Sequence, residues 1–127
     1  MHPILQNIFA VITGGVIGSV VNMSLIIVSP KVFPLPELSD PMNAMNWDLK
    51  FFIFPFLAHA LGTLAGAFLA AKIAATHQQI LGLLIGGFFL IGGIMMVFLL
   101  PAPTWFIVLD LVIAYIPMAW LGMRLAR

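Results

Sequence analysis

One uninterrupted apolar stretch, ILGLLIGGFFLIGGIMMVFLL at residues 80–100, sets the class of this protein. It contains no charged or polar side chain, and about 20 apolar residues are enough for a helix to cross the hydrocarbon core of a bilayer. Three further apolar stretches occupy residues 4–28, 51–75 and 104–123. We therefore predict an all-α membrane protein whose residues 1–127 form one domain, a bundle of four transmembrane helices.

The composition of the chain agrees with a membrane protein. Of its 127 residues, 63% are hydrophobic and 7% are charged, whereas about 25% are charged in an ordinary soluble domain. A water-soluble monomer is excluded, and the lipid bilayer is the expected surrounding. The net charge of +1 gives no basic surface for nucleic acid. Because the chain has no cysteine, it cannot form a disulfide or use a thiolate.

Residues 29–50 form the only sizeable loop expected between the four helices. They hold four of the prolines and five of the nine charged residues, so they cannot cross the bilayer. Asp40 and Pro41 resemble an N-cap followed by a first helical residue. We predict a short interfacial helix after them, running through Met45 and Trp47.

Basic residues near the ends of the predicted helices indicate the orientation. Lys72, Arg124 and Arg127 fall on the side of both termini without acidic neighbours, whereas Lys31 and Lys50 on the other side are accompanied by three acidic residues. Cytoplasmic flanks of membrane helices are enriched in Lys and Arg. We therefore expect both termini in the cytoplasm and the loop of residues 29–50 outside it.

Glycines spaced four residues apart mark the surfaces where these helices are expected to pack, because small residues allow close approach of helices in lipid. One interpretation is packing within a single bundle. The other is that the third helix, which also carries Gly87, Gly92 and Gly93, leaves a glycine face free for a second copy or a partner. The glycines spaced four residues apart are Gly14 and Gly18 in the first helix, Gly62 and Gly66 in the second, and Gly82 and Gly86 in the third.

Among the polar residues inside the predicted helices, three are the most informative about function: Asn22, His59 and Asp110. Counted along their helices, all three lie roughly 9–13 Å below the outer boundary, and each shares a face with small residues. We expect them to form one cluster in the outer half of the bundle, with Thr63 as a neutral hydrogen-bond partner. The cluster is either a structural network or a proton or ion site in which His59 and Asp110 exchange a proton.

Two prolines, Pro55 and Pro117, are each expected either to kink a helix and free a carbonyl or to be tolerated without effect. No hydrolase, zinc-protease or phosphate-binding motif is present in the sequence, and one intramembrane Asp with one His is too few for a metal site. We therefore expect no catalytic residues, no metal and no cofactor.

Two segments, FPFLAHALGT at residues 54–63 and PTWFIVLD at residues 103–110, resemble a group of short four-span bacterial membrane proteins without an assigned activity. The resemblance implies a location in the bacterial inner membrane. Fluoride channels share the four helices, but here Gly62-Thr63-Leu64 is not followed by their Asn. Small multidrug exporters need a glutamate in the first helix, and the only glutamate here is Glu37 in the loop.

The sequence leaves two functions open. The first is a scaffold or accessory subunit that acts through helix packing, as a homodimer or within a larger membrane complex. The second is a small homodimeric channel or proton-coupled transporter that uses His59 and Asp110. The first is favoured because a transport pathway needs polar residues at several depths, and the inner half of the predicted bundle offers little beyond Thr13.

Overall fold

The computed structural model describes residues 2–127, and these contain four helical segments long and apolar enough to cross a membrane. The first is α1 (Pro3–Val32), the second is the 3-10 helix η1 (Leu49–Phe52) with α2 (Ile53–Ile73), and the third is α3 (Gln78–Leu99). The fourth consists of two half-helices, α4 (Thr104–Ile113) and α5 (Ile116–Leu125). The predicted class, an all-α four-span bundle, is confirmed.

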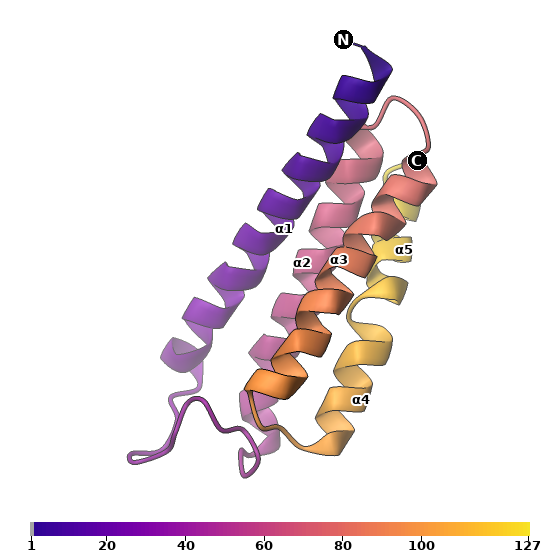
Figure 1. Cartoon of the computed structure of the whole chain (residues 1–127). Helices are drawn as coiled ribbons and strands as arrows, with labels where there is room; N and C mark the ends of the chain where they lie inside the picture. Colours follow the sequence, from indigo (N-terminus) through magenta and orange to yellow (C-terminus); the bar gives the residue numbers. More distant parts are fainter. Residues whose placement is uncertain (1) are drawn as a thin grey trace.

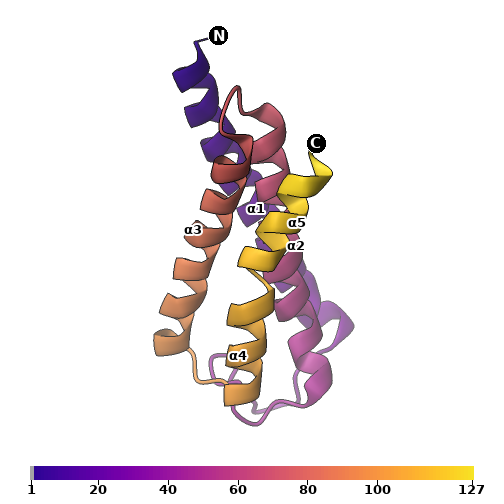
Figure 2. The ribbon, with the colours of Figure 1, turned by 90° about the vertical axis from the view of Figure 1, so that its right-hand side faces the viewer.

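The segments run alternately up and down, as Figures 1 and 2 show. Both marked chain ends and the connection between α2 and α3 lie at one end of the bundle, which we call the terminal end. The long loop after α1 and the connection between α3 and α4 lie at the other, the loop end. A hydrogen bond from the Ala44 amide to the Pro101 carbonyl, 2.8 Å long, joins these two loop-end segments.

The loop itself differs from the prediction. α1 continues four residues beyond the expected end, through Pro30 to Val32, so Asn22 lies about 15 Å from the end of its helix, deeper than expected. The predicted interfacial helix through Met45 and Trp47 is wrong, because that segment forms turns. The Asp40 side chain accepts a hydrogen bond from the Met42 amide, as an N-cap does, but the Ala44 amide bonds to the Pro101 carbonyl instead of continuing a helix.

α1 and α2 pack closely through their glycines. A Cβ atom added at Gly14 would lie 2.5 Å from the Gly66 carbonyl oxygen, and one added at Gly18 would lie 2.7 Å from the Gly62 carbonyl oxygen. The same closeness is found from the α2 side, at 2.6 Å for Gly66 and 2.8 Å for Gly62. At these four positions the backbones are too close for any side chain.

In the terminal half of the bundle, α5 packs against α3 and α2, again through glycines. An added Cβ at Gly82 would meet Met123, and one at Gly86 would lie 2.5 Å from the Ala119 Cβ. Gly122, which sequence reasoning did not single out, lies against the Leu64 carbonyl of α2. α5 therefore fills the space beside Gly82 and Gly86. At Gly15, Gly87 and Gly92, by contrast, an added Cβ would meet nothing within 4 Å.

The fourth span is interrupted at Ala114 and Tyr115, which form a turn between α4 and α5 (Figure 2). The cause is Pro117, which has no amide hydrogen to donate to the Ile113 carbonyl. Pro55 behaves differently, because it lies in the first turn of α2, where helix amides have no partner in the helix.

Two residues near the start of α1 fasten it to the connection between α2 and α3. The Asn7 side-chain oxygen accepts hydrogen bonds from the amides of Ala75 (2.9 Å) and Thr76 (3.2 Å), and its nitrogen donates to the Thr76 hydroxyl. Gln6 donates to the Ile73 carbonyl at 2.7 Å, where α2 ends. These contacts fix the terminal end of α1 against α2.

Candidate functional site

His59 of α2 and Asp110 of α4 meet inside the bundle. The His59 Nδ1 atom lies 2.8 Å from Asp110 Oδ1, and their side chains are 24% and 8% exposed. A hydrogen bond between a ring nitrogen and a carboxylate oxygen at this distance satisfies both groups. The two side chains are thus paired inside the bundle.

Tyr115, in the turn between α4 and α5, contacts both members of this pair. Its hydroxyl donates a hydrogen bond of 3.2 Å to Asp110 Oδ2, and its ring stacks on His59 with a centroid distance of 5.8 Å. Gly93 of α3 gives the Tyr115 ring its space, since an added Cβ there would lie 2.6 Å from the hydroxyl oxygen. Each carboxylate oxygen of Asp110 therefore has its own partner.

Tyr115 was missed from the sequence because it does not share a helical face with Asp110. In a continuous helix, residues five apart point in different directions. The interruption of the fourth span turns Tyr115 back towards Asp110. The available signal was its position two residues before Pro117, combined with its being the only tyrosine of the chain.

Thr63 and Asn22 form no hydrogen bond to the side chains of the His59–Asp110 pair, contrary to the expected cluster. The buried Thr63 hydroxyl donates to the His59 carbonyl at 2.7 Å, so it bonds the backbone of α2 rather than the His59–Asp110 pair. Asn22 lies beside Gly62, whose added Cβ would be 3.0 Å from the Asn22 Cβ. Its side-chain oxygen is buried and has no hydrogen-bond partner among residues 2–127.

A cavity of about 560 Å³, which we call the loop-end cavity, lies beside these residues. All four spanning segments and the long loop contribute to its wall. Polar groups reach it from Asn22, His59 and Asp110, and most of the remaining wall is apolar. Trp47 also lines it, and the Trp47 Nε1 atom is a second buried polar atom without a partner among the described residues.

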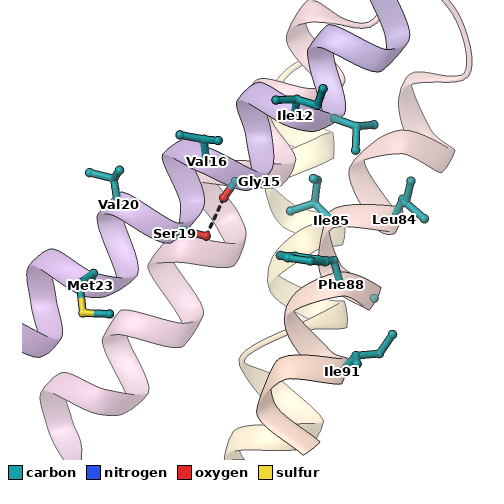
Figure 3. Close-up of a pocket in the computed structure, with 12 residues that line it drawn as sticks. Ile12, Gly15, Val16, Ser19, Val20, Met23, Leu84, Ile85, Phe88 and Ile91 are labelled. Atoms are coloured by element: carbon teal, nitrogen blue, oxygen red, sulfur yellow. Dashed lines mark hydrogen bonds between the residues drawn. The ribbon is translucent and has the colours of Figure 1, made fainter. Parts of the chain in front are cut away.

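An apolar groove of about 1010 Å³, the α1/α3 groove, runs along the seam between α1 and α3. Figure 3 shows side chains of both helices along it, with the Ser19 hydroxyl bonded back to the Gly15 carbonyl at 2.7 Å. Gly15 and Gly87 line the groove, and Met23 lines both the groove and the loop-end cavity. The two spaces therefore adjoin at Met23.

Within residues 2–127, no three His, Asp or Glu side chains come together in a way that could hold a metal ion. The site consists of an imidazole and a carboxyl group in hydrogen-bond contact, supported by a phenol, at the edge of a mostly apolar cavity.

Comparisons with protein-family models, with curated proteins and with solved structures give no match to this chain. The resemblance carried by residues 54–63 and 103–110 thus stays a prediction. The chain itself is an integral membrane bundle of four spanning segments with a buried His59–Asp110 pair.

Proposed function

We propose that this chain is a scaffold or accessory subunit of a membrane complex, without catalytic activity of its own. The terminal end would face the cytoplasm and the loop end the outside of a bacterial inner membrane. The single observation that supports this function is the α1/α3 groove, where a Cβ atom added at Gly15 or Gly87 would meet nothing within 4 Å.

The groove suits a transmembrane helix of a partner or a second copy. Helices in lipid associate through close van der Waals contact at small residues, and Gly15 and Gly87 leave room for that approach from opposite walls. Ser19, the one hydroxyl along the groove, already donates to the Gly15 carbonyl, so the groove demands no polar group from its occupant. The glycines that pack inside the bundle are not available for this role.

Substitution of the groove glycines tests the proposal. Gly15→Leu and Gly87→Leu fill the groove without meeting other atoms near their Cβ, so the variants keep the melting temperature of the unmodified chain. They are expected to lose the higher-mass assembly seen by native electrophoresis after mild solubilisation. Gly92→Leu is the matched control, because Gly92 is equally open but does not line the groove.

Two results would contradict the scaffold proposal. If the unmodified chain migrates as a single copy after mild solubilisation and after cross-linking in native membranes, there is no assembly to explain. If Gly92→Leu disrupts the assembly while the two groove variants keep it, the association surface lies elsewhere.

A second candidate function is a proton-coupled carrier or channel, acting as a homodimer. It is favoured by the contact of the His59–Asp110 pair with a cavity whose wall includes the long loop. The terminal half weighs against it, because fully buried Ala67, Ala70 and Ala119 leave no polar path there.

Proton flux into liposomes containing the purified protein, followed with an internal pH-sensitive dye, separates the two functions. A carrier is expected to show flux that Asp110→Asn abolishes, while Asp48→Asn, a change in an exposed loop carboxylate, leaves it intact. Absence of flux from the unmodified protein, or equal flux from both variants, would eliminate this second candidate.

A further inference from the structure

We infer that the loop-end cavity binds a small molecule with an apolar body and one hydrogen-bond-donating end, a hydroxyl or an ammonium group. This inference goes beyond the scaffold proposal and does not depend on it, because it concerns a different space in the bundle. Three observations carry it: two unpartnered polar atoms, a concentration of acceptors at one place, and an apolar wall of suitable size.

The unpartnered atoms are the Asn22 side-chain oxygen and the Trp47 Nε1 atom. Both residues line the same cavity, although they come from α1 and the long loop. A buried polar atom without a partner is costly, and in native proteins such atoms are few. Two such residues in the wall of one cavity indicate a site that is completed by a bound molecule.

The polar groups around Asn22 indicate that the bound molecule carries a hydrogen-bond donor. Each Asp110 carboxyl oxygen takes part in one hydrogen bond, Oδ1 with His59 and Oδ2 with the Tyr115 hydroxyl, and each oxygen has two lone pairs. The Asn22 oxygen is an acceptor without a donor. The free capacity beside the His59–Asp110 pair is therefore accepting capacity, which a hydroxyl or an ammonium group can use. A hydroxyl oxygen can in addition accept a hydrogen bond from the unpartnered Trp47 Nε1 atom, whereas an ammonium group cannot.

The remaining wall suits an apolar body. Aromatic rings line it, among them Phe33, Phe52 and Phe106, together with Met96. Aromatic faces attract cations as well as apolar groups, and methionine adapts to irregular shapes. The volume of about 560 Å³ falls within the roughly 300–1,000 Å³ of small-molecule sites.

The α1/α3 groove supplies a route from the bilayer. Met23 lines both spaces, and its flexible side chain is the group that a molecule moving from the groove to the cavity would pass. A molecule with an apolar body and a hydroxyl end dissolves in the bilayer, and one with an ammonium end partitions into it with the charge at the headgroup region. Either can therefore reach the site laterally, without crossing the loop.

Quenching of Trp47 fluorescence tests the inference directly. A chain with Trp105→Phe and Trp120→Phe retains Trp47 as its only tryptophan, and bromine quenches tryptophan at short range. The probes are para-bromobenzyl alcohol, para-bromobenzylamine and para-bromobenzyl methyl ether, which share a body and differ in their donating end. The protein is studied in lipid nanodiscs, as the full chain.

We expect saturable quenching of Trp47 by the alcohol or the amine, at a concentration about tenfold lower than the ether requires, since one hydrogen bond separates them. The stronger of the two probes identifies the hydroxyl or the ammonium as the preferred end. A chain that retains only Trp120, which is half exposed on α5, reports quenching by probe dissolved in the bilayer. That control is expected to be linear.

Asn22→Leu removes the unpartnered acceptor and is expected to weaken binding of the donating probe about tenfold, while raising the melting temperature of the empty protein. Ser24→Ala is the matched control on α1, since its hydroxyl only donates to the Val20 carbonyl. Ether binding as tight as alcohol and amine binding would overturn the donor assignment. Linear quenching by all three probes, as expected if water occupied the cavity, would overturn the site.

Discussion

Alanine substitutions at Gly14 and Gly15 measure how much the contact between α1 and α2 contributes to stability. These neighbours lie on one helix, and each substitution adds one methyl group. At Gly14 the added Cβ would lie 2.5 Å from the Gly66 carbonyl oxygen and 3.0 Å from the Ala70 Cβ, whereas at Gly15 it meets nothing within 4 Å. The pair therefore separates crowding from helix propensity.

The expected difference follows from those distances. Ordinary contacts begin near 3.4 Å, so at Gly14 the two helices must separate by about 0.9 Å, and overpacking of this kind costs about 1–3 kcal/mol. Alanine is about 0.5–1 kcal/mol better than glycine inside a helix, and both variants receive this gain, so it cancels in the comparison. The two variants should therefore differ by roughly 1–3 kcal/mol in the free energy of unfolding, which is the overpacking cost.

Reversible unfolding in bicelles, followed by tryptophan fluorescence, gives that free energy for each variant. The adjacent pair Gly86 and Gly87 provides an independent repeat, because an added Cβ meets Ala119 at the first and nothing within 4 Å at the second. If Gly14→Ala proves as stable as Gly15→Ala, α1 and α2 do not approach each other as described. The packing argument would then be refuted.

Three more predictions concern the ends of the bundle and its buried pair. For orientation, a cysteine replacing Ser39 should be labelled in intact cells by an impermeant thiol reagent and one replacing His77 should not; the reverse pattern would invert the proposed topology. Tyr115→Phe removes one hydrogen bond to Asp110 and keeps the ring, so chemical unfolding should show a loss of about 0.5–1.5 kcal/mol; a larger loss would mean that the ring itself has moved. Asn7→Ala removes three hydrogen bonds to the connection between α2 and α3 and should lower the melting temperature measured by size-exclusion after heating; an unchanged value would show that these bonds do not hold α1.

Much of the fold could be predicted from the sequence because the bilayer imposes a simple rule. A segment of about 20 apolar residues has to satisfy its backbone internally, and a helix does so. The meeting of His59 with Asp110 follows from the same reasoning, since intramembrane polar groups seek each other inside the bundle. These features depend on composition and helical spacing alone.

The features that sequence reasoning missed depend on local competition between hydrogen bonds. The Ala44 amide donates to the Pro101 carbonyl of a distant segment, and the predicted interfacial helix does not form. The break before Pro117 brings Tyr115 to a position that helical spacing does not give. Asn22 shares the cavity with the pair without bonding to it, because α1 is held by its glycines at a fixed distance.

The interrupted fourth span also divides the molecule into two mechanical regions. α5 is held by Gly122 against the α2 backbone and by Ala119 against Gly86, whereas α4 forms part of the cavity wall. Bending at Ala114 and Tyr115 breaks fewer hydrogen bonds than bending an intact helix, since Pro117 has no amide to contribute. We therefore expect α4 to move more readily than α5, and amide hydrogens of the loop half to exchange with solvent faster than those of the terminal half. Bending of α4 alters the wall of the loop-end cavity while the terminal half keeps its glycine contacts.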